Sequence, residues 1–521
     1  MRILFLARHY TYFRNFEAVL RQLAQRGHLL HLVVERGDTL GGVAMVEALA
    51  AEFPSITYGE APSRAADEWS WVVQRLRLGL DHLRYQHPIF DSAWKLRERS
   101  RQRTPGFFVR IGIVTHVLGG WARRLFTHVL RAIERAVPED LAIRRYLESQ
   151  RPDLLLLTPL VDLGSSQIEY LRAARTLRIP TGLCVWSWDH LSSKALIRET
   201  PDRVLVWNET QKREAVALHD VSPDRVVVTG AQCFDWWFES RPTRDRNAFC
   251  RDAGLPPAPY LLWVCSALIH GSAAEAPLVR KWIEALRHSG SPRLRDVPIL
   301  VRPHPSRRAE WEGVDLSALN AVVWGGNPID GPSRADYFDT LYYSAAVVGI
   351  NTSAFIEAAI LGRPVYTLMI PETADNQTGT VHFTYLLKTG GGVLEVARSF
   401  NEHIPQLDHA LNEPRQVVKP FVREFVRPHG LDVSAAQRFV EAVESMNGLT
   451  VRALRPSPLV PMWRLIAHRA ARMRDDDRYE RWTLSARELA SVEKLRGARR
   501  LKALRRAEAR RAQNVDAQGT R

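Results

Sequence analysis

Residues 345–368 constrain the fold of this chain more than any other stretch of its sequence. They begin with an apolar run at 345–348, whose composition is typical of a strand that a parallel sheet buries on both faces. The polar turn at 351–353 is typical of a helix start, and Gly362 followed by Pro364 is typical of a helix end. A second apolar run follows. The stretch therefore predicts a strand, a short helix and a second strand of one parallel sheet.

The polar turn and the helix behind it are typical of a site for a nucleotide phosphate. A turn between the carboxyl end of a strand and the amino end of a helix presents free N–H groups and the positive end of the helix dipole. If Ser353 is the N-cap, the capping-box position falls on Ile356, so Glu357 is not required as a cap. Its carboxylate is then well placed to accept hydrogen bonds from ribose hydroxyls. A surface β-α-β unit with a dipole-favourable acid fits the same residues equally well.

The same positions resemble the nucleotide-sugar site in the C-terminal domain of GT-B glycosyltransferases. They are equally similar to the UDP-N-acetylglucosamine 2-epimerases that share this fold. The residues that carry the resemblance are Thr352, Ser353, Glu357, Gly362, Pro364 and Val365. In those families the glutamate five residues before the glycine binds the ribose, and Glu357 and Gly362 keep that spacing. The Gly-Gly phosphate turn of the epimerases is replaced here by Asn351, Thr352 and Ser353. This departure weakens the epimerase assignment more than the transferase assignment. The resemblance implies that the turn and Glu357 bind the donor.

Composition is that of a soluble globular protein of more than one domain. With 521 residues the chain exceeds what a single core usually supports, and its hydrophobic (45%) and charged (25%) fractions are ordinary. The four cysteines contain no C-x-x-C pair, which argues against a disulfide framework or a zinc site and favours the reducing cytosol. No apolar run reaches the length of a membrane span, and the apolar N-terminus is interrupted by Arg8 too early for a signal peptide.

Alternating apolar runs and helical segments predict an α/β fold with two doubly wound, Rossmann-like parallel sheets that face a cleft, the GT-B architecture. We expect a first, acceptor-side domain at 1–240 with a mostly helical insertion at 61–150, and a proline-rich linker at 241–259. A second, nucleotide-sugar-binding domain at 260–448 should be closed by a helix at 435–445. The predicted strands are 3–7, 30–35, 154–158, 183–187, 203–207 and 225–229 in the first domain, and 260–265, 299–302, 321–324, 345–348 and 364–368 in the second.

Two further motifs follow strands of the second domain. Arg302 and His304 stand at a strand end that prolines on both sides of His304 make stiff. A similar Arg and His-Pro pair occurs in GT-B enzymes and in CDP-glycerol phosphotransferases, which implies contacts with the nucleotide phosphates or the sugar, with Arg302 as a fork donor. A rigid loop with a surface arginine is the alternative.

A polar loop after the last predicted strand resembles the acidic-amide sugar contact of GT-B donor sites. Asp375, Asn376 and Gln377 offer both donors and acceptors to the hydroxyls of a pyranose. His382, a few residues later, is either a ligand contact or a core histidine.

Candidate bases for acceptor activation lie in the first domain. Inverting transfer needs a group that deprotonates the acceptor hydroxyl, and an Asp or His of the acceptor domain is the usual supplier. Asp189 and His190 follow a predicted strand beside two tryptophans that would offer a stacking face, and His9 follows the first strand. Asp189 could equally cap the next helix. No Asp-x-Asp motif stands at a strand end, so we expect no catalytic metal and no cofactor.

The tail at 449–521 is strongly basic. From Val451 onward there are 19 Lys and Arg against 8 Asp and Glu, a net charge of +11, which leaves +4 of the total +15 for the first 450 residues. Between Lys494 and Arg511 nine basic residues accompany one acid and a narrow apolar stripe, the pattern of an interfacial helix that binds an anionic membrane. A solvated helix without a partner is the alternative. The run lacks aromatic residues, which disfavours nucleic acid.

These features lead to one working hypothesis. The chain is expected to be a metal-independent GT-B glycosyltransferase that moves a sugar from a nucleotide diphosphate-sugar to a bacterial envelope glycan or lipid-linked acceptor, in the cytoplasm and peripherally on the membrane. A CDP-polyol phosphotransferase, a nucleotide-sugar 2-epimerase and a non-catalytic sugar-nucleotide binding protein are the alternatives.

Overall fold

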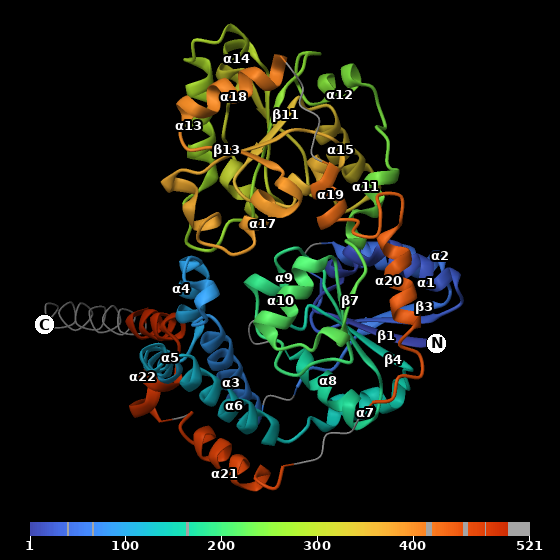
Figure 1. Cartoon of the computed structure of the whole chain (residues 1–521), viewed down its shortest axis with the longest axis vertical. Helices are drawn as coiled ribbons and strands as arrows, with labels where there is room; N and C mark the ends of the chain where they lie inside the picture. The colour runs from blue at the N-terminus through green and yellow to red at the C-terminus, as the bar shows by residue number, and fades with distance from the viewer. Residues whose placement is uncertain are drawn as a thin grey trace, which may run out of the picture. The chain divides into compact units, whose positions relative to one another are not determined.

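The computed structural model describes residues 1–38, 41–64, 67–162, 166–412, 419–451, 457–474 and 476–498. Residue contacts divide them into two compact units (Figure 1). The first unit holds both β-sheets and comprises residues 1–64, 92–95 and 139–451. The second is helical and is drawn from 67–91, 96–138 and 457–498.

The first sheet has seven parallel strands in the order β3-β2-β1-β4-β5-β6-β7. Their bounds are β1 Arg2–Ala7, β2 Leu29–Val34, β3 Ile56–Glu60, β4 Leu154–Thr158, β5 Thr181–Cys184, β6 Arg203–Val206 and β7 Val226–Val228. All five residues of β4 are buried, as expected for an apolar strand covered on both faces. Strand order reverses between β1 and β4, where doubly wound sheets place their ligands.

The helices of the first domain cover this sheet. They are η1 Tyr10–Phe16, α1 Glu17–Gln25, α2 Gly42–Glu52, α7 Leu141–Gln150, α8 Gln167–Thr176, α9 His190–Ser193, α10 Glu209–His219, η3 Pro223–Arg225, η4 Gln232–Phe234 and α11 Asp235–Glu239. Capping residues start several of them: Asp140 accepts from two N–H groups of α7, and Asn208 accepts from Gln211 N in α10.

The second sheet has six parallel strands in the order β10-β9-β8-β11-β12-β13, so its order reverses between β8 and β11. The strands are β8 Leu261–Val264, β9 Ile299–Arg302, β10 Ala321–Val323, β11 Ala346–Gly349, β12 Val365–Leu368 and β13 Leu394–Ala397. Around them lie α12 Arg246–Asp252, α13 Glu275–Arg287, α14 Pro292–Asp296, η5 Pro305–Trp311, η6 Ser317–Leu319, α15 Gly331–Tyr342, α16 Ala354–Ile360, η7 Pro371–Asn376, α17 Phe383–Lys388, η8 Thr389–Gly391, α18 Phe400–Asn412 and α19 Lys419–Phe425. The two doubly wound sheets confirm the predicted fold class; β3 and β13 were not predicted.

The helix expected to close the second domain packs elsewhere. α20 (Ala435–Glu444) buries Phe439 in the core of the first sheet, with its ring centroid 5.8 Å from that of Phe16. Glu444 pairs with Arg26 and His28 of the first domain. The prediction that the helix at 435–445 packs on the second domain is therefore wrong. An apolar stripe indicates that one face of a helix is buried, but not which sheet covers that face.

The helical unit joins the insertion to the C-terminal region. It contains α3 Glu68–Arg84, η2 Pro88–Phe90, most of α4 Trp94–Arg103, α5 Gly106–Leu118, α6 Gly120–Ala136, α21 Val460–Ala471, η9 Asp477–Tyr479 and α22 Glu480–Thr483, and residues 486–498 are also helical. α6 packs against α3, α5 and α21 (Figure 1), and a buried ion pair joins Arg77 to Glu134 at 2.7 Å. No helix in the described part of the chain is long and apolar enough to cross a membrane.

Candidate functional site

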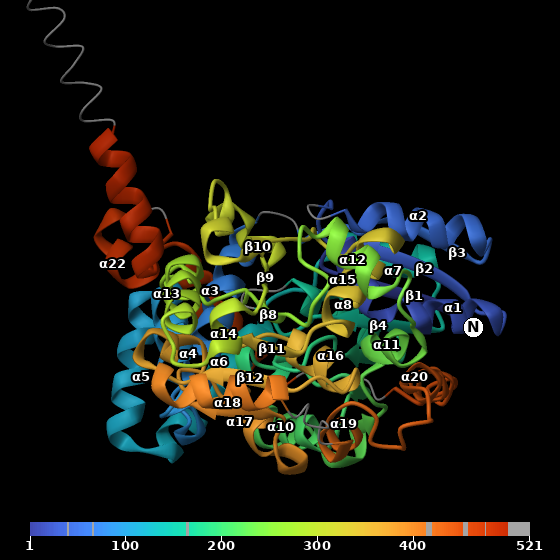
Figure 2. The same cartoon turned by 90° about the horizontal axis from the view of Figure 1, so that it is seen from above.

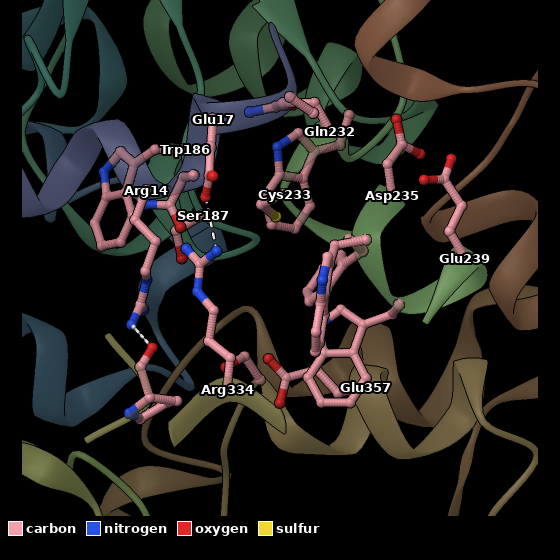
Figure 3. A pocket seen from close by; sticks show the side chains of 18 of the residues that line it. Arg14, Glu17, Trp186, Ser187, Gln232, Cys233, Asp235, Glu239, Arg334 and Glu357 are labelled. Carbon is pink, nitrogen blue, oxygen red and sulfur yellow. Dashed lines mark hydrogen bonds and ion pairs between the residues drawn. The ribbon is translucent and has the colours of Figure 1, made fainter. Parts of the chain in front are cut away.

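A pocket of about 460 Å³ lies within the first unit, at the carboxyl ends of its strands (Figure 3). Its walls come from the segments after β1, β5, β6, β7 and β10, and from α15 and α16 on the two sides of β11. Both sheets therefore contribute to it, as expected for ligand sites of doubly wound sheets. Its lining includes Arg14, Glu17, Arg21, Trp186, Ser187, Trp188, Trp207, Gln232, Cys233, Asp235, Trp236, Trp237, Glu239, Pro328, Arg334, Tyr337, Ser353, Glu357 and Ser434.

Two arginines, from helices of the first and the second domain, point into this pocket. Arg14, in η1, donates from Nη1 to the carbonyl of Pro328 at 3.2 Å. Arg334, in α15, donates to Glu17 Oε2 at 2.7 Å, and both side chains of this pair are about one-fifth exposed. The remaining N–H groups of each fork face a pocket open to a ligand (Figure 3). Paired guanidinium groups suit a diphosphate.

Glu357 lies in the same pocket, in the first turns of α16. Burial raises the pKa of its carboxyl to about 7, although the Tyr337 hydroxyl, Arg14 and Arg302 act in the opposite direction. Tyr337 OH donates to Glu357 Oε2. The carboxylate is thus anchored by one hydrogen bond, with further acceptor capacity toward the pocket.

The turn before α16 is only partly directed at the pocket. Ser353 is its exposed N-cap residue and makes no side-chain capping bond. Asn351 is bound in the second domain: its N–H donates to Ser266 Oγ at 3.1 Å, and its side-chain amide contacts the carbonyl of Asn376 and, at 3.2 Å, His382 Nε2. Thr352 Oγ1 accepts from Ala354 N at 3.4 Å.

Arg302 is the last residue of β9, as predicted, but its guanidinium is occupied. Nη1 donates to Asp336 Oδ2 and to Thr340 Oγ1, both at 2.8 Å, and the group lies 4.9 Å above the Tyr337 ring. Its link to Glu357 is indirect: the guanidinium packs on the Tyr337 ring, and the Tyr337 hydroxyl donates to Glu357. His304 caps η5, and burial together with Arg14 and Arg307 lowers its pKa to about 4.

The predicted sugar-binding loop mainly ties the second domain together. Gln377 donates to the carbonyls of Ile350 and Leu368. Asn376 Oδ1 accepts from Ile269 N at 2.7 Å, and Asp375 pairs with Lys95 at 2.9 Å. These groups are not among the pocket-lining residues.

Of the three candidate bases, two are engaged. Asp189 accepts from Ser187 Oγ at 2.6 Å and from Ser193 Oγ at 2.5 Å. Burial would raise its pKa, yet Lys194, His382 and these hydroxyls hold it well below the usual range, which makes a weak base. His190 is buried, donating from Nε2 to the carbonyl of Pro159 at 2.7 Å and accepting at Nδ1 from Trp186 N at 3.3 Å; its pKa is lowered to about 4 by burial.

His9 differs from both. Its Nδ1 is buried and has no hydrogen-bond partner among the described residues. Its ring packs on Tyr12 at 4.5 Å, and Tyr12 packs on the pocket residue Trp186 at 4.8 Å. Burial and Arg8 lower the pKa of His9, so its imidazole is neutral near pH 7. His9 is not among the pocket-lining residues and lies behind Tyr12 and Trp186. A neutral ring with an unpartnered nitrogen can accept a proton.

His382 contacts both the candidate-base segment at 186–190 and the predicted donor-binding turn at 351–353. Its ring lies against Trp188 at 4.7 Å, edge to face, beside Asn351. The segment 186–190 and the segment 351–382 are therefore neighbours, whereas Arg302 and Gln377 are held apart from the pocket by their own partners.

Sequence reasoning missed Arg14, Glu17, Arg334 and Tyr337. An arginine inside the aromatic segment directly after the first strand was the available signal for Arg14. Nothing in the local pattern of α15 distinguishes Arg334 from a surface residue. Among the residues that the structure describes, no cluster of three or more His, Cys, Asp or Glu is arranged to hold a metal ion.

The two doubly wound parallel sheets are those of the GT-B fold. No protein-family model and no curated protein matches the sequence. Solved structures that match include a UDP-GlcNAc 2-epimerase from Methanocaldococcus jannaschii (12% identity, 85% of this chain, 100% of that chain, TM-score 0.48) and a glycosyltransferase from Rickettsia africae (11%, 85%, 98%, 0.48). A UDP-GlcNAc 2-epimerase from Neisseria meningitidis, bound to UDP-GlcNAc, also matches (12%, 85%, 100%, 0.48).

Proposed function

We propose that this chain is a glycosyltransferase that moves a sugar from a nucleotide diphosphate-sugar to a bacterial envelope glycan or lipid-linked acceptor. One observation carries the proposal: Arg14, Arg334 and Glu357 line a single pocket at the carboxyl ends of two doubly wound sheets. Two cationic forks and a carboxylate match the two ends of a nucleoside diphosphate, its phosphates and its ribose hydroxyls.

In this proposal the forks of Arg14 and Arg334 bind the diphosphate and stabilise it as the leaving group. Glu357 accepts hydrogen bonds from the ribose, and Tyr337 orients it. Arg302 is a positioning residue, which holds α15 through Asp336 and packs on Tyr337. The pocket tryptophans, Trp186 and Trp188 among them, offer faces on which a sugar ring packs.

We assign the base to His9. The hydrogen bonds of Asp189 and His190 stabilise the protein, whereas the Nδ1 of His9 has no partner within the described residues. The acceptor hydroxyl would lose its proton to this nitrogen while its oxygen forms a bond to the anomeric carbon of the sugar and the bond from that carbon to the diphosphate breaks. Charge on the leaving diphosphate is met by the arginines, so the reaction needs no metal.

The acceptor and its location belong to the same proposal. The basic tail is proposed to bring the enzyme to the cytoplasmic face of an anionic membrane, where lipid-linked acceptors lie. Of the predicted interfacial segment at 494–511, residues 499–511 lie outside the described residues.

A thermal-shift screen of UDP-, GDP-, ADP- and CDP-sugars tests the donor. We expect one class to raise the melting temperature of the wild-type chain and to do so less in the Glu357→Ala variant. Products then separate the candidate reactions. Sugar transfer to an added acceptor supports the proposal. Conversion of the donor alone to its 2-epimer, or a new phosphodiester from a CDP-polyol, would replace it with one of the alternative enzymes. Stabilisation by no nucleotide would refute it.

A further inference from the structure

The helical unit carries an exposed apolar surface on α5 and α6. Val117 is 79% exposed, Ile113 62% and Trp121 60%, and Leu125 is more than half exposed. These four residues follow one another at intervals of four along the chain, from the last turns of α5 into the first turns of α6. We refer to them as the hairpin patch.

The exposed residues of the hairpin patch are distinct from the residues of α5 that pack inside the helical unit. α5 buries Phe108, Gly112 and Thr115, and it packs against α3 and α6 (Figure 2). A Cβ at Gly112 would lie 2.6 Å from His82 Nε2 of α3, so this close approach needs glycine. These contacts fix the rotation of α5 about its axis. The helix therefore cannot turn to bury its exposed apolar face inside the unit.

The segment that forms the α5–α6 hairpin is basic. Between Glu98 and Glu134 the sequence contains seven arginines and no acidic residue. Glu134 is buried in its ion pair with Arg77 and adds nothing to the surface. Arg124 is exposed on α6 beside Trp121 and Leu125 in the sequence, and Arg110 is exposed on α5. The exposed surface thus combines aliphatic side chains, a tryptophan and arginines.

We propose that the α5–α6 hairpin docks on an anionic phospholipid surface, with the hairpin patch inserted at the level of the headgroup–acyl boundary and Arg110 and Arg124 at the lipid phosphates. Apolar and tryptophan side chains with a basic border are the composition of helices that lie in the membrane interface. The residues of this site lie outside the basic tail, although α21 and α22 of the tail pack against α6 and α5. The site does not depend on the chemistry of the donor pocket.

The charge argues against two other occupants. A second copy of the chain would bring the exposed Arg110 and Arg124 of one hairpin against the same arginines of the other, which costs free energy. Nucleic acid would attract the arginines but would leave Ile113, Val117 and Leu125 without apolar partners. Only a surface that is both anionic and apolar satisfies all the exposed groups.

Sedimentation of the full chain with vesicles tests the site. Phosphatidylcholine vesicles with phosphatidylglycerol should bind the wild-type chain, and phosphatidylcholine alone should bind it weakly. The Val117→Ser/Trp121→Ser variant should lower the partition coefficient roughly ten-fold or more, because two inserted side chains become polar or small. Arg124→Gln should lower it roughly five-fold. Leu141→Ser, which changes an equally exposed leucine on α7 outside the helical unit, is the control and should bind as the wild type does.

Ionic strength separates the hairpin from the tail. High salt weakens the attraction of the strongly basic tail more than that of the apolar hairpin patch, so most of the binding that remains in the wild-type chain should be the part that the double variant has lost. Unchanged melting temperature and unchanged binding of a nucleoside diphosphate by the double variant would show that fold and pocket are intact. Equal partition of the wild-type chain and the double variant at both salt concentrations would overturn the proposal. So would dimerisation of the wild-type chain that the double variant abolishes in the absence of vesicle binding.

Discussion

The carboxyl of Glu357 should make both stability and donor binding depend on pH, and Glu357→Gln should remove both effects. The pKa of this group is raised to about 7 from an ordinary value of 4.5 by burial. Between these values the folded chain keeps a proton that the unfolded chain has released, so stability falls as the pH rises and is constant above about 7. At 1.36 kcal/mol for each pKa unit, the loss amounts to at most about 3 kcal/mol.

Donor binding should respond in the opposite direction. The ionised carboxylate makes the stronger hydrogen bonds to ribose hydroxyls, so the affinity of the wild-type chain should rise as Glu357 loses its proton around pH 7. Glu357→Gln replaces charge-assisted bonds with neutral ones, and it should cost about 1.5–3 kcal/mol above pH 7, roughly ten- to a hundred-fold in Kd. Below pH 6 the two proteins should differ much less, because the wild-type carboxyl is then neutral as well.

Two measurements check this reasoning on the same proteins. Denaturant unfolding at pH 5 and pH 8 should show the glutamine variant gaining stability relative to the wild type only at the higher pH. Calorimetry with the preferred nucleoside diphosphate gives the two affinities. Glu239→Gln is the matched control, since Glu239 is an exposed carboxylate of the same pocket. A stability difference independent of pH would contradict the raised pKa, and a Kd unaffected by Glu357→Gln above pH 7 would exclude the ribose contact.

Four further predictions concern the pocket. Arg14→Ala should weaken nucleoside diphosphate binding by roughly ten-fold or more through the loss of a charged hydrogen bond, whereas Arg21→Ala, which removes an arginine paired with Glu17 and Glu52, should change it little; equal effects would contradict the diphosphate role. His9→Gln should lower kcat by roughly 10²–10⁴-fold with Kd for the donor unchanged, and an unchanged kcat would exclude His9 as the base. Activity should persist in excess chelator, and loss that magnesium or manganese restores would show a metal requirement. Glu17→Gln should tighten diphosphate binding by a few-fold, as measured by calorimetry, because it frees Arg334 from its ion pair; weaker binding would mean that Glu17 positions the arginine.

The fold was predictable because its signals are local. An apolar run such as 154–157 has one low-energy environment, a strand covered on both faces, and β4 occupies it completely. β3 escaped prediction because its exposed residues, Thr57 and Tyr58 among them, break the apolar run of an edge strand.

Side-chain roles were less predictable because partners come from distant parts of the chain. Arg302 stands at the expected end of β9, yet Asp336 and Thr340 on α15 take its guanidinium. A strand-end position specifies where a side chain starts, not which helix packs over it. Gln377 is similar: its amide meets the backbone carbonyls that remain where β11 and β12 end, and buried carbonyls require donors.

The arginines of the pocket were also not predictable from the sequence around them. Arg14 and Arg334 are separated by 320 positions, and they come together because η1 of the first domain and α15 of the second line the same pocket. Arg334 is already paired there with Glu17 of the first domain, in an ion pair that water still reaches. Such a pair contributes about 1 kcal/mol at most. A diphosphate offers the same guanidinium more charge and more acceptor oxygens, so the resting ion pair can be exchanged for ligand at small cost.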